Sequence, residues 1–589
     1  MEFTYNKLDN TNLYNIAISP EFLNLDSPQN FVPIYSRFFS LNEKNFNKVT
    51  LNNKYNLDSI NEMIDHNSCK AKIIDISGNL KTKDVFFKYS PLLDPTKYLI
   101  GRYDLSDNSL LGLPSLINKT CHAKTADPNN SAYVDGFFNY LSSQMLNTHN
   151  FPHGLDFFGS FLAKKHDFQY NIADDVEYLN NSEFFHEKRG ILFDIDNTYA
   201  NDMFNFDTRQ NKERILITNN SDENEYLDLS DISDLKQLDN IFTNGSNTTD
   251  TIDINKDVDL VFSYDISANA NLENDSSDCS SRSSVTNDSC DDDNKCDDDD
   301  DDDCDDDDNK CDDVDNMDDD SDISDSYSTA TEDVLLATIK DFPVQVIALE
   351  KCFATLDSLI IDNEDDISDK EWGCIMFQII MILLAYNKSF GFTHNDLHTN
   401  NIMYVHTEKK HLYYRFGEKH YKVPTFGRLY KIIDFGRAVY KFRGNVVCSD
   451  SYHPKGDAAS QYNFEPYFNS KKPRVDPNFS FDLCRLSCSL YDFIIDDVED
   501  EDINSSKTEA RRMIIGWCID DKNRNILYKQ NREERYPDFK LYKMIARTVH
   551  KHTPESVIKS QYFDRYLISK KKINAKAKII NIDSLPSYQ

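Results

Sequence analysis

Apolar positions along the chain fall into helical and strand-like patterns on either side of one long polar stretch. Residues 369–387, DKEWGCIMFQIIMILLAYN, are apolar nearly all round, which predicts a helix buried in the middle of a domain. Residues 131–145 carry aromatic and aliphatic side chains near helical spacing and predict a second helix. We expect helices and strands together, in an α+β fold.

Strand-like runs surround both predicted helices. Two short runs, at 72–75 and 83–95, flank a turn that contains Gly78. Residues 154–172 are expected to form a strand pair, and residues 342–360 a strand that leads into a short helix. Two further strand-like runs lie at 411–416 and 419–436, where they predict an inserted hairpin.

The polar stretch spans residues 197–333 and ends in a tract of Asp, Ser and Cys. Its charge and its lack of apolar residues cannot repay the entropy cost of ordering, so we predict a disordered acidic insertion. The simplest interpretation of the tract is a solvated low-complexity spacer. Attraction of basic substrates and weak Ca²⁺ binding remain alternatives.

The net charge of −37 limits the classes of partner. Residues 291–320 hold 20 Asp and two Lys, so they carry −18 and leave −19 for the rest of the chain. That balance argues against a broad basic face for nucleic acid. The N-terminus has no signal-peptide pattern, and the most apolar run, 375–386, is too short to span a bilayer. We therefore expect a soluble, cytoplasmic protein without a nucleic-acid or membrane partner.

The 13 cysteines contain no C-x-x-C pair, and five of them lie in or beside the acidic tract. This distribution favours free thiols in a reducing compartment over a disulfide scaffold or a zinc site.

Residues 394–401, HNDLHTNN, concentrate polar side chains shortly after the predicted buried helix. Three interpretations are open for this octapeptide. In the first, it is a polar loop whose side chains form hydrogen bonds with its own backbone groups. In the second, His394, Asp396 and His398 form a metal site. In phosphoryl transfer, by contrast, an Asp orients a hydroxyl and an Asn five positions later holds a metal ion.

A second motif favours the third interpretation. The strand-like run that ends in IIDFG places Asp434 at a strand end before a turn. The order of buried helix, H-x-D-x-x-x-x-N loop, strand and D-F-G resembles the protein kinase superfamily. The H-x-D-L-H form is similar to haspin-type kinases and to aminoglycoside and sugar phosphotransferases. The motifs and the Asn-rich composition also resemble kinase-like proteins of giant DNA viruses.

The resemblance implies a two-lobed protein-kinase-like fold that binds ATP and Mg²⁺ between its lobes. In the larger, helical lobe, Asp396 would be the catalytic base, and Asn401 and Asp434 would hold the metal. His394 would pack beside the D-F-G turn, and Asp482 would hold the catalytic loop.

In the smaller lobe the resemblance assigns Lys88 to the α- and β-phosphates and pairs it with an acid from the following helix, here Asp135. Backbone groups between Glu350 and Cys352 would meet adenine. No G-x-G-x-x-G precedes Lys88, so Gly78 alone would mark the turn that covers the phosphates.

These assignments divide the chain into five parts. They are an N-terminal extension (1–60), the first part of the small lobe (61–196), the acidic insertion (197–333), the rest of the small lobe with hinge and large lobe (334–575), and a tail (576–589).

The predicted function is ATP- and Mg²⁺-dependent phosphoryl transfer to Ser/Thr hydroxyls of a protein substrate, for which the acidic tract suggests a basic one. A small-molecule phosphotransferase acting on a sugar or aminoglycoside-like acceptor, or a catalytically weak pseudokinase scaffold, are the alternatives. Asn395 stands where many kinases have an arginine that binds a phosphorylated residue. Activity is therefore expected without phosphorylation of residues 437–466.

Overall fold

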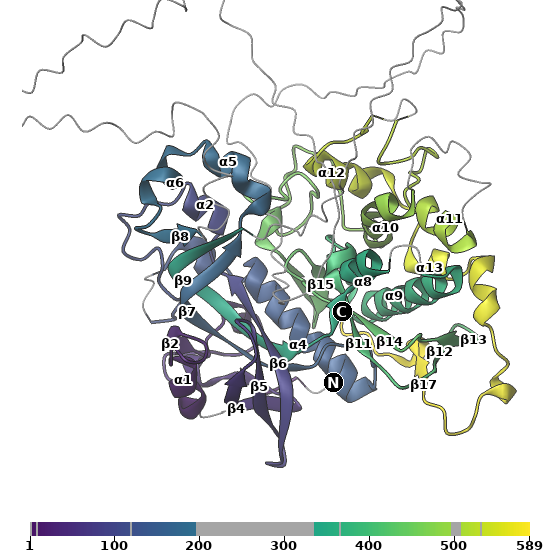
Figure 1. The fold of residues 1–589 in the computed structure, drawn as a ribbon, viewed down its shortest axis with the longest axis horizontal. Coiled ribbons are helices and arrows are strands. Elements are labelled where there is room, and N and C mark those ends of the chain that lie inside the picture. The colour runs from purple at the N-terminus through teal and green to yellow at the C-terminus, as the bar shows by residue number, and fades with distance from the viewer. Residues whose placement is uncertain are drawn as a thin grey trace, which may run out of the picture. The chain divides into compact units, whose positions relative to one another are not determined.

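A large antiparallel sheet, a long helix beside it and a group of further helices make up the computed structural model (Figure 1). The structure describes residues 3–6, 10–117, 121–195, 335–363, 367–495, 508–529 and 533–589. The predicted acidic insertion, 197–333, lies outside the described residues. The observed combination of helices and strands confirms the α+β class.

The largest sheet has seven antiparallel strands in the order β2-β7-β9-β6-β5-β4, with β8 paired to β9. Residues 154–172 contribute one long strand to it, so the predicted strand pair is wrong. The strands are β2 (Leu25–Gln29), β4 (Tyr55–Met63), β5 (Ser68–Asp75), β6 (Leu80–Pro91), β7 (Phe157–Asn171), β8 (Phe193–Ile195) and β9 (Leu336–Glu350).

Side chains of this sheet alternate between two hydrophobic clusters, as the period of two in a strand requires. Val85 and Phe87 of β6 lie in the cluster that also holds residues of α1 and α2. Ile347 and Leu349 of β9 lie in the other cluster, with α4 and the helices beyond it. Lys88, next to Phe87, therefore points to the α4 side of the sheet.

Helix α4 (Ser131–His149) begins at Asn130, whose side chain accepts the Ala132 N–H at 3.0 Å. It ends at Asn150, which adopts the left-handed conformation with φ of 55°. Residues 132–145 are all buried. Gly136 allows close packing on the sheet, because a Cβ there would meet the Gln345 side chain of β9 at 2.3 Å.

Helix α9 (Asp369–Phe390) is the centre of the helical part, as its uniformly apolar sequence predicted. By length and composition it is the one described helix that could span a membrane, and 89% of its most apolar window is buried within the structure. This position suits the core helix of a soluble protein. The helices after it are α10 (Phe481–Ile494), α11 (Glu509–Gly516), α12 (Phe539–Thr548) and α13 (Pro554–Val557).

Three small sheets have the strand orders β10-β11-β14, β13-β12-β17 and β15-β16. Most of their strands lie between α9 and α10 in the chain, whereas β10 precedes α9 and β17 follows α13. The antiparallel pair β12 and β13 confirms the predicted hairpin insertion. The strands are β10 (Ala354–Thr355), β11 (Ile402–His406), β12 (His411–Phe416), β13 (Lys419–Pro424), β14 (Arg428–Ile432), β15 (Val439–Phe442), β16 (Asn445–Cys448) and β17 (Ile579–Asn581).

The remaining elements are short. They are β1 (Tyr5–Asn6), α1 (Thr11–Ala17), β3 (Thr50–Leu51), α2 (Pro95–Leu99), α3 (Ala123–Ala126), α5 (Val176–Asn180), α6 (Glu183–Lys188) and α8 (Leu356–Asp362).

Both ends of the chain belong to the fold, which corrects two predicted boundaries. The boundary at residue 60 falls inside β4, and β2 pairs with β7 in the main sheet. Near the other end, β17 pairs in parallel with β12, and the Tyr588 N–H donates to the Ser389 carbonyl at 2.7 Å. The predicted extension and tail are therefore parts of the domain.

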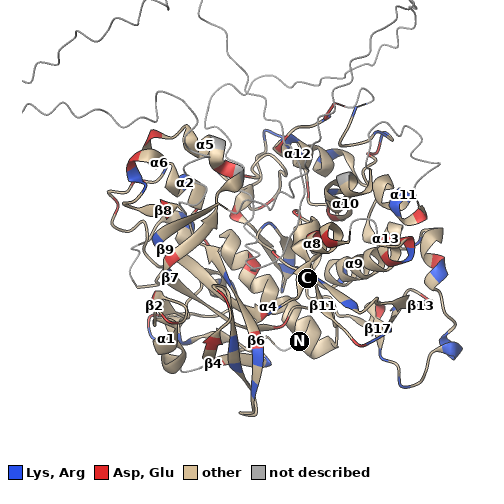
Figure 2. Ribbon diagram, in the orientation of Figure 1, with Lys and Arg blue, Asp and Glu red and all other residues tan. Residues whose placement is uncertain are grey.

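Helices α6 and α11 each carry charges of both signs (Figure 2). The eight cysteines among the described residues are all free.

The aromatic cluster around Phe138 of α4 yields a stability prediction. Phe138 is fully buried, with ring centroids of Phe392, Phe435 and Tyr440 at 4.3, 4.6 and 4.8 Å. Phe138→Ala should lower the free energy of unfolding by about 3–5 kcal/mol, because it leaves a cavity in a packed core. Urea denaturation measures the change. Ile76→Ala is the control, since Ile76 is 92% exposed, and an equal loss in both variants would contradict the packing.

Candidate active site

Lys88 is bound between two carboxylates from different parts of the fold. Its Nζ lies 2.9 Å from Oδ2 of Asp135, on α4, and 2.9 Å from Oδ1 of Asp434, at the end of β14. The lysine side chain is 17% exposed and the two acids are 2% and 8% exposed. The predicted pairing of Lys88 with Asp135 is thus present, and Asp434 joins the same group.

Asp135 also binds the turn that follows Asp434. Its Oδ1 accepts the Phe435 N–H at 2.8 Å and an Asn139 amide N–H at 3.0 Å. Burial raises the pKa of Asp135, the Lys88 ammonium opposes that shift, and the Asp434 charge adds to it. With its hydrogen bonds satisfied, Asp135 fixes the turn and the lysine together.

Asp482 of α10 binds the backbone of the loop that carries HNDLHTNN. The two Asp482 oxygens accept the backbone N–H groups of His394 (2.9 Å) and Asn395 (2.8 Å). His394 makes a 2.9 Å hydrogen bond to the carbonyl of Ile433, next to Asp434. Both contacts agree with the predicted structural roles of Asp482 and His394.

Asp396 lies among cationic groups. Its Oδ2 is 3.8 Å from NH1 of Arg437, and its Oδ1 accepts the Tyr542 hydroxyl at 2.7 Å. Burial alone would raise the pKa of Asp396, but the charges of Arg437, His398 and Arg485 and the Tyr542 hydrogen bond lower it well below its ordinary value. Asp396 is therefore ionised at neutral pH.

Asn401 follows on the same loop, and its backbone carbonyl pairs with Ile433, the residue before Asp434. Its side-chain amide donates to the Asp396 carbonyl at 2.9 Å, and its own carbonyl accepts the Ile433 N–H at 3.0 Å. Asn401 and Asp434 offer an amide and a carboxylate oxygen, the ligand types that Mg²⁺ prefers. The described residues contain no cluster of three His, Cys, Asp or Glu side chains that would form a metal cage. Mg²⁺ commonly needs only one or two carboxylates plus phosphate oxygens, so the donor set fits that ion.

A pocket of about 200 Å³ lies at this group of residues. Its lining includes Lys88, Asp135 and Asp434, together with the predicted hinge residues Glu350 and Cys352. The Glu350 carboxylate also pairs with the buried Lys431 of β14, so it joins the large sheet to the helical part.

The structure corrects the placement of Gly78. Gly78 lies in the turn between β5 and β6, has φ of 82° and does not line the pocket. The neighbouring turn, between β4 and β5, does line the pocket, through Asp65, His66 and Asn67. In an antiparallel sheet consecutive turns lie at opposite ends, so a turn one strand away from Gly78 faces the pocket.

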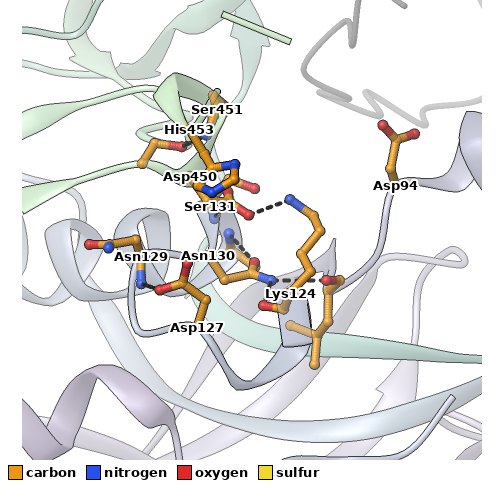
Figure 3. Close-up of polar contacts among 12 residues, drawn as sticks. Asp94, Lys124, Asp127, Asn129, Asn130, Ser131, Asp450, Ser451 and His453 are labelled. Carbon is orange, nitrogen blue, oxygen red and sulfur yellow. Dashed lines mark hydrogen bonds and ion pairs between the residues drawn. The ribbon is translucent and has the colours of Figure 1, made fainter. Parts of the chain in front are cut away.

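A second set of polar contacts joins the start of α4 to the segment after Asp434. Oδ1 of Asp450 accepts the Ser131 N–H at 2.9 Å, and Oδ2 forms an ion pair with Lys124. The Asp450 N–H donates to the Asn129 carbonyl at 2.7 Å. Figure 3 shows the Lys124 amino group directed at the Asp450 carboxylate. A carboxylate at the first turn of α4 also suits the positive end of the helix dipole.

Sequence reasoning missed four residues of this region: Lys124, Asp450, Asp457 and Tyr542. Asp457 pairs with Arg437 at 2.6 Å, and no sequence motif marks any of the four residues. No model of a known protein family matches the chain, and no curated protein matches it significantly.

The contacts of Asp450 predict a measurable contribution to stability. Asp450→Ala should lower the free energy of unfolding by about 1.5–3 kcal/mol, because it removes a charged hydrogen-bond acceptor and leaves Lys124 unpaired. Asp450→Asn keeps one acceptor and should cost less. Chemical denaturation compares both with Asp476→Ala, whose exposed pairing with Arg474 should be worth under about 1 kcal/mol. Equal losses at positions 450 and 476 would refute this account.

Proposed function

We propose that the protein transfers the γ-phosphoryl group of ATP to Ser/Thr hydroxyls of protein substrates, through a two-lobed protein-kinase-like fold. The single observation that carries the proposal is Lys88, held at 2.9 Å from both Asp135 and Asp434 at the edge of a pocket. In protein kinases a strand lysine and a helix acid form such a pair, and the D-F-G aspartate must stand beside them.

The arrangement of elements supports the fold part of the proposal. The sheet with α4 carries Lys88 and Asp135, as a small β-rich lobe would. The helical part around α9 carries Asp396, Asn401 and Asp434, as a larger lobe would. The strand β9 ends at Glu350, and the chain continues past the pocket into the helical part, where a hinge would lie.

Each side chain has a task in this reaction. Lys88 would neutralise the α- and β-phosphates, and backbone groups from Glu350 to Cys352 would meet adenine. Asp434 and Asn401 would hold Mg²⁺, which supplies positive charge beside the phosphate oxygens when bound. Asp135 would keep Lys88 in place.

Asp396 would receive the hydrogen bond of the acceptor hydroxyl. Its low pKa keeps it ionised, so it orients the hydroxyl and takes the proton late, once the bond to phosphorus forms. This timing suits phosphoryl transfer, whose loose transition state places little demand on early deprotonation.

One observation favours a second candidate, a binding scaffold with weak catalysis. The turn over the pocket has no glycine, and the Asn67 N–H already donates to Asp65 at 2.8 Å. A turn whose N–H groups are occupied offers phosphate fewer donors. Lys351, 3.1 Å from Asp65, partly offsets the carboxylate charge there.

The proposal is tested with labelled ATP, Mg²⁺ and a serine-containing protein mixture. Asp396→Asn should reduce label transfer about 10²- to 10⁴-fold, the usual range for a lost general base. Thermal stabilisation by ATP and Mg²⁺ should persist, because Asp396 does not line the pocket. Asp476→Asn, an exposed position, is the matched control. Label in small molecules only would identify a small-molecule phosphotransferase, and no label with nucleotide bound would identify a scaffold.

Asp434→Ala should act on nucleotide binding instead. It removes the carboxylate that would face both Mg²⁺ and Lys88, so the Mg²⁺-dependent part of the ATP-induced thermal shift should disappear. A titration with ATP in Mg²⁺ and in EDTA separates this part from the rest. If the shift kept its full dependence on Mg²⁺, Asp434 would not be a metal ligand.

A further inference from the structure

Tyr542 contacts Oδ1 of Asp396, the oxygen to which the hydroxyl of an acceptor would bind. Its hydroxyl donates to Asp396 Oδ1 at 2.7 Å, within the range required between a hydroxyl nucleophile and its base. The other oxygen, Oδ2, faces the Arg437 guanidinium at 3.8 Å. An acceptor hydroxyl that binds Oδ1 therefore competes with Tyr542 for the same site.

The Tyr542 side chain is fixed by more than this hydrogen bond. The Arg485 Nε–H donates to its hydroxyl at 2.9 Å, and the Phe539 ring stacks on it at 5.2 Å between centroids with an interplanar angle of 9°. The guanidiniums of Arg437 and Arg485 lie 5.6 and 5.1 Å from the ring centroid. Two cations over one ring stabilise its position.

The rest of α12 is attached on the side away from Asp396. Ile545 and Ala546 are buried, and the Arg547 guanidinium donates to the carbonyls of Gln461 (3.0 Å) and Ser460 (2.9 Å). Tyr542 lies in the preceding turn, and the N-cap residue Asp538 makes no capping hydrogen bond with its side chain. Tyr542 is therefore held by the contacts of its own side chain, and the N-cap of α12 adds no side-chain hydrogen bond to them.

We propose that the Tyr542 hydroxyl occupies the acceptor position of the free protein, so that an acceptor hydroxyl reaches Asp396 only by displacing it. The proposal rests on the function proposed above and defines the acceptor chemistry further. A group that replaces the Tyr542 hydroxyl must donate to Asp396 and accept from Arg485 at once. An alcohol does both, whereas an ammonium group has no acceptor.

In the transfer itself the acceptor O–H bond breaks, its oxygen bonds to the γ-phosphorus of ATP, ADP leaves, and the proton passes to Asp396. Tyr542 takes no part in these bond changes. Its effect is on access, so it should appear in the apparent affinity for the acceptor and not in the rate at saturation.

Tyr542→Phe tests the proposal, because it removes the hydroxyl and keeps the ring. With a serine-containing peptide as acceptor, KM should fall roughly tenfold, the scale of one hydrogen bond to a charged group, while kcat stays unchanged. ADP release without peptide should rise, since water can then reach Asp396. Tyr536→Phe is the matched control, a tyrosine of the same region that makes no hydrogen bond to Asp396.

A second variant protects the test against loss of folding. Tyr542→Leu removes hydroxyl and ring together, and thermal unfolding establishes that both variants are folded. An unchanged KM, or a fall in kcat at constant KM, would overturn the proposal, because Tyr542 would then only position Asp396. If ATP and Mg²⁺ stabilise the protein and no variant transfers or hydrolyses ATP, the displacement proposal is wrong while nucleotide binding stands. If nucleotide does not bind at all, the proposed function itself fails.

Discussion

The position of Lys88 between Asp135 and Asp434 is the interaction on which the rest of the site depends. A lysine buried to this degree needs opposite charge close by, since desolvation of an unpaired ammonium costs several kcal/mol. Its two partners come from a helix packed on the sheet and from the end of a strand in the helical part. The requirement to neutralise one cation therefore brings three elements, distant in the chain, to one point.

Around this point the neighbouring contacts act as supports for backbone geometry. Asp135 accepts the Phe435 N–H, Asp482 accepts the N–H groups of His394 and Asn395, and Asp450 accepts the Ser131 N–H at the start of α4. In each case a carboxylate satisfies backbone donors that would otherwise be unpaired in a buried region. The acids of the site thus serve the fold as well as the proposed chemistry.

Local sequence signals were enough to predict the elements that carry the site. The helical spacing of apolar residues in α4, the uniform apolarity of α9 and the strand before Asp434 all agree with the structure. The pairing of Lys88 with Asp135, which the family resemblance implied, is also present. The boundaries at 60 and 576 were wrong, because pairing of β2 with β7 and of β17 with β12 joins segments more than a hundred residues apart. Periodicity reports which face of a strand is buried, but it does not report the partner strand.

The same limit explains the misplaced glycine and the missed residues. Gly78 was assigned to the pocket because it precedes Lys88 in the sequence. In the antiparallel sheet, however, the β5–β6 turn that holds Gly78 and the β4–β5 turn lie at opposite ends. Asp450 and Tyr542 lie in segments without a motif and reach the site only through tertiary packing. Nothing in the local sequence distinguishes Tyr542 from the other 31 tyrosines of the chain.

Asp450 and Tyr542 together indicate where control of the proposed reaction would lie. A carboxylate that belongs to the chain keeps its contacts with Lys124 and Ser131 without any modification, unlike a phosphate that a phosphatase can remove. Asn395, which has no charge, instead accepts the Tyr462 hydroxyl at 2.8 Å and donates to the Arg437 carbonyl at 3.0 Å. The segment after Asp434 is therefore ordered by hydrogen bonds and by ion pairs of residues that belong to the chain, among them Arg437 with Asp457. In the proposed reaction, the step open to control would be the proposed displacement of Tyr542, which would depend on the acceptor and not on a modification of the segment.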